Sequence, residues 1–544
     1  MKLADLIEAM GADVTIRGQV RDTNIDTITD DSREVTSRSI FAVTALSAKH
    51  LADALERKPA LLIIPRSLLS SLSKDYLREG AVAFGTRPAR SRPEWILGSM
   101  AGHLYEHPDR SIELVAVTGT NGKTSISQMI YFSWKSQGQP CGVIGTLGAR
   151  WFDGEKEITL DTGYTTPRSY QLLQLLQQMQ RAGIRRVALE ASSEALALGR
   201  LEGIRISKAV FCGLSMDHLN YHKTMSRYFM AKLHLFALLR RSQGHAIIQD
   251  LTDYRISKKP VDSEQPHSLT SRPGSDRAAR RLERFLLRSN GSFEIVSEFR
   301  PFALNVSVEF NVRNANLAWR ASGLNYAKDL FASMSDVPGR MNKIEVGPGI
   351  DAIVDYAHTP DALERILEQL RTAGYNKLIC VFGCGGDRDR GKRIPMGRAA
   401  FTGSDVAIVT DDNPRTEDAG EIRAEVLRAA TDLPGNSVAR VLEMADRREA
   451  IRHALEIALE LQSARLSNAH GSESGATDVD EIKANRANNA DEPDESNGNG
   501  SIENLRLAVL IAGKGHEDYQ IYGREKRHFS DMEEIEKFIE KLNV

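Results

Sequence analysis

The chain has 544 residues, of which 41% are hydrophobic and 26% are charged, and its formal net charge at pH 7 is -2. A chain of this length exceeds one hydrophobic core, so about three domains are expected. The balanced charge gives no electrostatic case for nucleic acid or an anionic membrane as partner, and no stretch is long and apolar enough to span a bilayer. We therefore expect a soluble, cytoplasmic protein, and the four cysteines show neither zinc nor disulfide spacing.

Residues 1–98 alternate short apolar runs, at 40–43, 60–65 and 81–84, with helical patterns. This alternation predicts a small α/β domain. It contains Asp30-Asp-Ser-Arg33, a polar loop before a strand. On its own, that loop is more typical of a turn than of a binding site.

The stretch from Glu113 to Ser125 is the most informative part of residues 99–333. The run 114–117 predicts a buried strand, 119–122 a tight turn and Lys123 a helix start. Such a turn surrounds a phosphate with backbone N–H groups, while Lys123 can reach the terminal phosphates and Thr124 can ligate Mg²⁺. The predicted ligand is ATP or a similar nucleotide. Because Val117 occupies the first glycine position of the phosphate-loop pattern, an ordinary strand-to-helix turn is the alternative.

Two later strands of this region run into carboxylates. The strand 186–190 ends in Glu190, and the strand 209–214 leads to Asp217 and His218. Because open parallel sheets place ligand groups at strand ends, these side chains are candidates for holding Mg²⁺. Capping or salt bridging is the alternative for each.

Residues 334–544 predict a third, Rossmann-like domain with four buried parallel strands at 351–356, 377–382, 405–410 and 506–512. Helical patterns such as 361–373 and 421–431 separate the strands. Each strand leads into a polar or glycine-rich loop, so the site is expected along that edge.

The segment 463–501 is rich in Asn, Asp, Glu, Ser and Gly and has few large apolar residues. We expect a disordered acidic insertion between a helix at 447–461 and the last strand, because such a composition cannot bury enough apolar surface to order itself. An interaction tail is the functional alternative.

Four motifs in this order resemble the Mur ligases of bacterial peptidoglycan synthesis: Thr118-Gly-Thr-Asn-Gly-Lys-Thr-Ser125, Asp355-Tyr-Ala-His-Thr-Pro360, Asp412-Asn-Pro-Arg415 and Gly513-Lys-Gly-His-Glu-Asp518. The resemblance is greatest to the type that adds the third residue of the stem peptide. It implies a UDP-sugar-binding N-terminal domain, a central P-loop-type ATPase domain with a parallel sheet, and a C-terminal Rossmann-like domain that binds the amino acid. It also implies an ATP-dependent amide ligase acting on UDP-N-acetylmuramoyl-L-alanyl-D-glutamate through an acyl phosphate.

The resemblance assigns the nucleotide and metal groups residue by residue. The ATP set comprises Thr118, Gly119, Thr120, Asn121, Gly122, Lys123, Thr124, Ser125, Asn311, Asn314, Arg340, Asp355 and His358. The implied Mg²⁺ ligands are Thr124, Glu190 and Lys232, the last as a carbamate, and the catalytic set is Lys123, Glu190, Lys232 and His218. Without the resemblance, Lys232 would be read as a solvated helical lysine.

The resemblance also assigns the two other substrates. The UDP-linked substrate is assigned to Ser32, Thr165, Thr166, Ser192 and Arg200. The incoming amino acid is assigned to Arg388, Asp412, Asn413, Pro414, Arg415, Gly513 and Glu517. The Asp-Asn-Pro-Arg form is associated with meso-diaminopimelate, whereas lysine-adding relatives differ. The planar forks of the arginines suit carboxylates, and Glu517 suits an ammonium.

The chain departs from the family pattern at Glu194, where histidine is usual, and at Gly213 and Met216. These departures leave three alternatives open: a different third amino acid, a ligase like folylpolyglutamate synthetase, or a catalytically weakened nucleotide-binding paralogue. We expect a monomer with small-molecule substrates as its partners.

Overall fold

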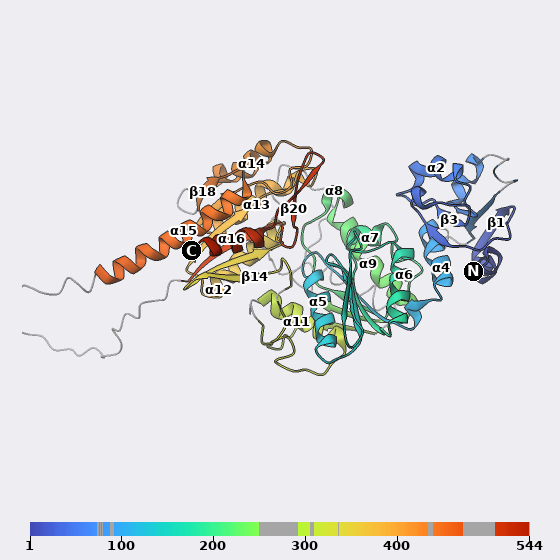
Figure 1. Cartoon of the computed structure of the whole chain (residues 1–544), viewed down its shortest axis with the longest axis horizontal. Coiled ribbons are helices and arrows are strands. Elements are labelled where there is room, and N and C mark those ends of the chain that lie inside the picture. Colours follow the sequence, from blue (N-terminus) through green and yellow to red (C-terminus); the bar gives the residue numbers. More distant parts are fainter. Residues whose placement is uncertain are drawn as a thin grey trace, which may run out of the picture. The chain divides into compact units, whose positions relative to one another are not determined.

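The computed structural model describes residues 1–72, 76, 78, 80–86, 92–249, 292–304, 309–335, 337–433, 439–471 and 506–542. Contacts divide the chain into two compact units, Met1–Ser335 and Asp336–Val544. Figure 1 labels the helices and strands of both units. Each unit is described by itself.

The first unit begins with a five-stranded sheet in the order β1-β5-β4-β3-β2. Its strands are β1 (Val14–Gly18), β2 (Thr27–Thr29), β3 (Ser39–Ala42), β4 (Leu61–Ile63) and β5 (Ala81–Gly85). Strand β1 is antiparallel to β5, and the other pairs are parallel. Helix α1 (Leu3–Met10) buries Leu3, Leu6 and Met10, and helix α2 spans Leu51–Glu56. The three apolar runs expected here are therefore strands.

A second sheet in this unit has eight strands in the order β13-β12-β11-β6-β10-β7-β8-β9. They are β6 (Glu113–Thr118), β7 (Cys141–Gly145), β8 (Gly148–Phe152), β9 (Glu157–Leu160), β10 (Arg186–Glu190), β11 (Lys208–Phe211), β12 (His245–Gln249) and β13 (Ser292–Val296). The strands β8 and β9 pair antiparallel, and the others pair parallel. Strand β6 lies between β10 and β11, because its apolar residues are buried on both faces.

The helices of the first unit are α4 (Pro93–Leu104), α5 (Lys123–Lys135), α6 (Ser169–Arg181), α7 (Ser193–Ala197), α8 (Leu219–His222), α9 (Met225–Arg241) and α11 (Glu309–Ser322). Helix α5 packs against α11, α4 against α6, and α7 against α9. Helix α4 begins at Pro93, whose fixed φ suits a first turn. It therefore spans the boundary expected between residues 98 and 99, and the domain limits stay a prediction.

The second unit contains a six-stranded sheet in the order β14-β15-β19-β16-β17-β18. Its strands are β14 (Asn342–Gly347), β15 (Ile350–Asp355), β16 (Lys377–Phe382), β17 (Val406–Val409), β18 (Arg440–Glu443) and β19 (Leu507–Ala512). All neighbours pair parallel except β14 with β15, so the four predicted parallel strands are confirmed. The edge strands β14 and β18 were not predicted, because they are partly exposed and lack a continuous apolar run.

The helices of the second unit are α12 (Pro360–Thr372), α13 (Arg393–Gly403), α14 (Ala419–Leu427), α15 (Arg447–Gly471) and α16 (Asp531–Leu542), and β20 (Tyr519–Tyr522) forms a hairpin with β21 (Glu525–His528). The prediction of a disordered insertion from residue 463 is wrong at its start. Helix α15 continues to Gly471, because the sequence from 461 still contains good helix formers such as Leu, Gln, Ala and Arg. Residues 472–501 of that prediction lie outside the described residues.

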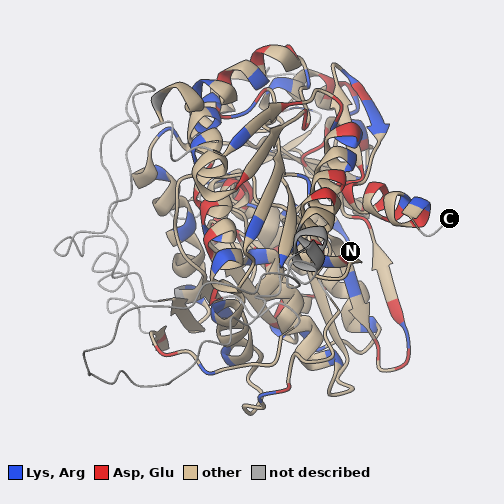
Figure 2. Cartoon of the chain, turned by 90° about the vertical axis from the view of Figure 1, so that its left-hand side faces the viewer, with Lys and Arg blue, Asp and Glu red and all other residues tan. Residues whose placement is uncertain are grey.

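Charge is mixed over the chain. Figure 2 shows basic and acidic residues interspersed along the helices and strands. Within the described ranges, no helix is both long enough and apolar enough to cross a membrane.

Candidate functional site

The loop between β6 and α5 is packed too closely for side chains at its glycines. Gly122 has a φ of 87°, and a Cβ placed there would lie 2.7 Å from Asn314 Oδ1. A Cβ at Gly119 would lie 2.3 Å from Cys212 Sγ. Lys123 folds back over the loop, and its Nζ donates to the carbonyl oxygens of Gly119 at 3.1 Å and Thr120 at 2.9 Å. The predicted strand, turn and helix are confirmed, and the N-terminus of α5 suits a phosphate.

The segment after β11 fixes this loop from one side. Thr120 Oγ1 accepts from the Ser215 N–H at 2.9 Å, and the Thr120 N–H donates to the carbonyl oxygen of Gly213 at 3.0 Å. Asn121 Nδ2 donates to Ser215 Oγ at 3.3 Å. Thr118 and Ser125 are buried at the two ends of the loop. The loop is therefore held in shape by its neighbours.

Glu190 is the buried centre of a hydroxyl cluster beside the loop. Its Oε2 accepts from Thr124 Oγ1 at 2.9 Å and from Thr146 Oγ1 at 3.1 Å, and its Oε1 accepts from the Thr146 N–H at 2.9 Å. Thr165 Oγ1 lies 3.2 Å from Thr146 Oγ1, and Thr166 Oγ1 donates to the Glu190 carbonyl at 2.7 Å. These hard oxygen atoms are the ligands that Mg²⁺ prefers.

Lys232, on α9, is almost fully buried at 1% exposure, so the interpretation as a solvated lysine is wrong. Its Nζ donates to the carbonyl oxygen of Gly119 at 2.6 Å and lies 4.3 Å from the centre of the Tyr228 ring. Burial, and then the positive charge of Lys123, lower the pKa of Lys232 well below its ordinary value. A neutral amine beside the phosphate loop is able to react with an electrophile such as CO₂.

His218 lies between two carboxylates near the same loop. Its Nδ1 lies 3.4 Å from Glu194 Oε1, and its Nε2 lies 3.2 Å from Asp217 Oδ2. The His218 ring packs against Tyr228 at a centroid distance of 6.1 Å, on the residue that also contacts Lys232. The departure at position 194 therefore places a carboxylate beside a candidate catalytic residue.

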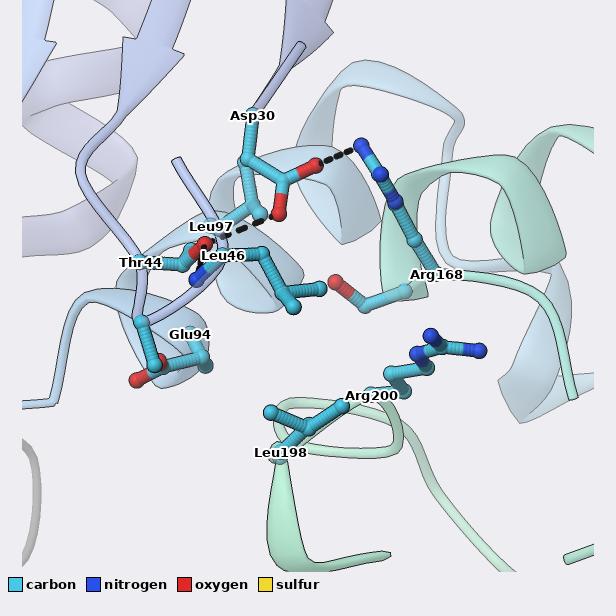
Figure 3. A pocket seen from close by; sticks show the side chains of 11 residues that line it. Asp30, Thr44, Leu46, Glu94, Leu97, Arg168, Leu198 and Arg200 are labelled. Carbon is cyan, nitrogen blue, oxygen red and sulfur yellow. Dashed lines mark hydrogen bonds and ion pairs between the residues drawn. The ribbon is translucent and has the colours of Figure 1, made fainter. Parts of the chain in front are cut away.

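The residues assigned to the UDP-linked substrate lie around one pocket (Figure 3). Residues that line it include Thr44, Leu46, Glu94, Arg168, Leu198 and Arg200. The Arg200 Nη1 donates to the Thr166 carbonyl at 2.9 Å, and the Ser192 N–H donates to Thr166 Oγ1 at 3.1 Å. Ser32 is buried in a short 3-10 turn, Ser32–Glu34, that follows β2.

An ion pair crosses this pocket between the two sheets of the first unit. Arg168 Nη1 donates to Asp30 Oδ1 at 2.5 Å, and Thr44 Oγ1 donates to Asp30 Oδ2 at 3.0 Å. In Figure 3 the Asp30 carboxylate points toward the Arg168 guanidinium. Tyr164 lies beside both arginines, with its ring centre 5.8 Å from the Arg168 guanidinium and 4.9 Å from that of Arg200.

Helix α11 carries the two asparagines assigned to ATP. Asn314 is buried against the phosphate loop, as its distance from Gly122 shows, and Asn311 lies one turn earlier. The contact between α5 and α11 therefore brings Asn314 to the loop, which sequence distance alone could not show.

Three residues assigned to ATP gather at the end of β15 in the second unit. Both Asp355 oxygens accept backbone N–H groups, Oδ2 from Met341 and Oδ1 from Ala357, each at 2.8 Å. The Arg340 guanidinium lies 4.5 Å from the centre of the Tyr356 ring. His358 Nδ1 lies 2.8 Å from the Tyr356 carbonyl oxygen. Burial raises the pKa of Asp355 above its ordinary value.

The loops after β17 and β19 bring the acidic part of the amino-acid set together. Asn413 Nδ2 donates to Glu517 Oε2 at 2.9 Å and to Asp412 Oδ1 at 3.2 Å. A Cβ at Gly513, whose φ is 115°, would lie 3.6 Å from Asp412 Oδ2. Burial, and then the charge of Asp412, raise the pKa of Glu517. This corner is suited to an ammonium group.

The basic part of that set lies around Gly385. A Cβ there would lie 2.9 Å from Arg415 Nη1 and 3.6 Å from Arg388 Cγ. Arg415 follows Pro414, has a φ of 54°, and its Nη1 donates to the Gly386 carbonyl at 2.9 Å. Two guanidinium groups near one exposed loop are suited to a carboxylate.

Sequence reasoning missed several contacts of the site. Thr146 follows β7 directly, so the strand-end argument that selected Glu190 could have found it. Tyr228, Arg168 and Lys514 carry no comparable sequence signal. Their roles depend on which distant segments they meet.

The chain matches known proteins along most of its length. The Mur ligase middle domain matches residues 117–321, and the Mur ligase, glutamate ligase domain matches residues 339–463. The chain is 33% identical over 527 residues to the UDP-N-acetylmuramoyl-L-alanyl-D-glutamate--2,6-diaminopimelate ligase of Leptospira borgpetersenii, with 94% of this chain and 93% of the relative covered.

Solved structures give a consistent result. One that carries the same ligase name aligns with a TM-score of 0.53 at 27% identity and covers 96% of both chains. The Mycobacterium tuberculosis folylpolyglutamate synthase, solved with ADP and AMPPCP, aligns with a TM-score of 0.50 at 16% identity over 76% of this chain and 91% of that one. The second likeness concerns the fold alone.

The parallel sheets, the phosphate loop and the buried carboxylate beside it define an ATP-dependent enzyme of the acid–amino-acid ligase class. The chain belongs to the Mur ligase family.

Proposed function

We propose that this enzyme joins meso-diaminopimelate to UDP-N-acetylmuramoyl-L-alanyl-D-glutamate at the expense of ATP. The observation that carries the proposal is the arrangement of the amino-acid loops in the second unit. An acidic corner at Asp412 and Glu517 lies in the same loop system as the guanidinium groups of Arg388 and Arg415, which Asn413 and Gly385 connect. A diamino diacid offers an ammonium to the first and a carboxylate to the second.

The chemistry requires positioning more than proton transfer by a side chain. The substrate carboxylate would attack the γ-phosphorus of ATP, ADP would leave, and an acyl phosphate would form. The incoming amine would then attack the acyl carbon, lose a proton and expel phosphate, leaving an amide. The loop N–H groups and Lys123 would hold the terminal phosphates, which accounts for a site rich in cations and oxygen ligands.

The residues present fit Mg²⁺. Thr124 and Glu190 supply hard oxygen atoms in one buried cluster next to the phosphate loop. Among the described residues, no group of three or more His, Cys, Asp or Glu side chains could hold a metal. That composition suits an ion that takes one or two protein ligands and completes its shell with phosphate and water. Bound there, Mg²⁺ would neutralise phosphate charge during transfer.

Lys232 fits the proposed carbamate. A carbamate forms only from a neutral amine, and burial beside Lys123 favours the neutral form of Lys232. The product is an anionic oxygen ligand in a site where the amine now contacts the Gly119 carbonyl and the Tyr228 ring. His218, which packs against that same ring, would be placed beside it.

For the UDP-linked substrate, we propose the pocket between the two sheets of the first unit. Ser32, Thr165, Thr166, Ser192 and Arg200 surround or adjoin it. Burial lowers the pKa of Arg200, which is the expected state of a cation waiting for an anionic partner. We further propose that the enzyme works as a cytoplasmic monomer on small molecules, and light scattering after gel filtration would test the oligomeric state.

A single-turnover assay tests the proposal. Purified protein with ATP, Mg²⁺ and the UDP-dipeptide should release ADP when meso-diaminopimelate is added, and mass spectrometry should detect the corresponding UDP-tripeptide. L-Lysine at the same concentration should give little product, because it lacks the second carboxylate. ADP release with L-lysine but not with meso-diaminopimelate would overturn the specificity.

A further inference from the structure

Lys514 is a fully buried lysine in the middle of the amino-acid loop. It has 0% exposure, and its Nζ lies 3.6 Å from Asp412 Oδ1 and 3.4 Å from Glu517 Oε2. The Tyr519 ring covers it, with a centroid distance of 5.4 Å. The ammonium is thus held among the same carboxylates that are proposed to receive the substrate.

Burying an ammonium is costly unless opposite charges compensate it, so its position needs an explanation. Two carboxylates compensate this one. Asn413 Nδ2 donates to both of them, which brings Asp412 Oδ1 and Glu517 Oε2 close together. Like charges at such a spacing cannot both stay ionised without a cation beside them.

The pKa of Glu517 reflects this balance. Burial and then Asp412 raise it, whereas Lys514 and the hydrogen bond from Asn413 act in the opposite direction. Other titratable or charged groups also act on this carboxylate, namely Tyr356, Tyr519 and Arg447. Lys514 is thus one of the groups that keep Glu517 ionised.

We propose that Lys514 is a positioning residue that acts through Asp412 and Glu517: it keeps both ionised and leaves the three groups with a net charge of -1, matched to one substrate ammonium. This inference rests on the proposed amino-acid site. Lys514 would not itself touch the transferred groups. Its contribution is to set the charge that the incoming ammonium meets.

The first test replaces Lys514 by methionine, which keeps the length of the side chain. K514M should raise the KM for meso-diaminopimelate about tenfold near pH 7, the effect of about one unit in the pKa of Glu517, with the KM values for ATP and the UDP-dipeptide unchanged. The ratio of KM between variant and wild type should fall toward one as the pH rises and Glu517 ionises. K514R keeps the charge and should restore most of the affinity.

K526M is the matched control. Lys526, exposed on β21, places its ammonium 3.9 Å from the centre of the same Tyr519 ring. Losing this cation should leave all three KM values unchanged. Equal effects of K514M and K526M would contradict a role through the carboxylates.

A charge-count experiment stays informative even if K514M does not fold. D412N leaves Lys514 and Glu517 with no net charge, so the KM for the amino acid should rise about tenfold. D412N/K514M restores a net charge of -1 and should bind the amino acid more tightly than D412N. A lysine with only a structural role would make the double variant worse than D412N, and that result would overturn the proposal.

The two proposals fail in distinguishable ways. If the wild type releases no ADP with meso-diaminopimelate, the proposed function is wrong. If the wild type is active but K514M has an unchanged KM for the amino acid at every pH, the role of Lys514 is wrong and the function stands.

Discussion

The Thr124 hydroxyl donates a 2.9 Å hydrogen bond to Glu190 Oε2 and so joins the first turn of α5 to the end of β10. Strands β6 and β10 are neighbours in the sheet, and their register pairs Glu190 with Val117, directly before the loop. Two residues 66 positions apart therefore form one oxygen-rich cluster beside the phosphate loop.

Removing the charge of Glu190 should reduce turnover while leaving the fold intact. E190Q keeps the shape of the side chain but replaces one oxygen that now accepts hydrogen bonds. We expect kcat to fall by at least about 100-fold, because a preorganised charge at the phosphates is lost. ADP release checks this. E155Q, on an exposed residue, is the control, and E190Q with a third of wild-type activity would disprove the role.

Activity should depend on CO₂ through Lys232. The low pKa of this buried amine favours carbamate formation at neutral pH. Enzyme prepared in CO₂-depleted buffer should lose most of its activity and regain it when bicarbonate is added. Carbon-13 NMR with labelled bicarbonate should show a carbamate signal that K232M lacks. A labelled signal that persists in K232M, or activity indifferent to CO₂, would contradict this prediction.

The Asp30–Arg168 ion pair should support binding of the UDP-linked substrate. R168M removes a mostly buried guanidinium next to Arg200 and leaves Asp30 without its cation. The KM for the UDP-dipeptide should rise about tenfold, with the KM for ATP unchanged, because the charge at this pocket alone is altered. D30N should add little to R168M if the two act as a pair. A parallel rise in the KM for ATP would point to general damage.

The Arg447–Asp531 pair should be a major source of stability in the second unit. Both side chains have 0% exposure; Arg447 Nε donates to Asp531 at 2.7 Å and its Nη2 to the Ala512 carbonyl at 3.0 Å. R447M would strand a buried carboxylate and should lower the free energy of unfolding by about 3 kcal/mol.

Chemical denaturation checks this prediction. R452M is the control on the same helix, because Arg452 pairs with Glu449 and Glu456 at the surface. It should cost no more than about 0.5 kcal/mol. Equal losses for R447M and R452M would show that burial does not govern the effect.

His107 should make the protein less stable in mild acid. Burial, and then Arg110, lower the pKa of His107 from 6.5 to about 4. The unfolded chain therefore binds a proton below about pH 6.5 that the folded chain binds only near pH 4, so stability falls as the pH decreases through this window. H107N suits the left-handed backbone at this position, where φ is 51°, and should flatten that dependence.

Urea unfolding between pH 7 and pH 4.5 measures this effect. H453N, on an exposed face of α15, is the control and should leave the slope unchanged. A wild-type slope retained in H107N would assign the acid sensitivity to other groups.

The comparison of sequence and structure separates two kinds of residue. Strands such as β10 and β16 were predictable, because continuous apolar runs can only be buried. The exposed edge strands β14 and β18 and the extension of α15 to Gly471 were not, since pairing and helix propagation at the surface leave little trace in hydrophobicity.

By itself, the sequence determined the phosphate loop, the parallel sheets and the family, because glycine spacing, apolar periodicity and ordered motifs are local properties of the chain. The burial of Lys232 and Lys514 and the meeting of Thr124 with Glu190 were decided only by tertiary structure. The physical reason is that a side chain's charge state and partners depend on which distant segments surround it, and no local pattern encodes those neighbours.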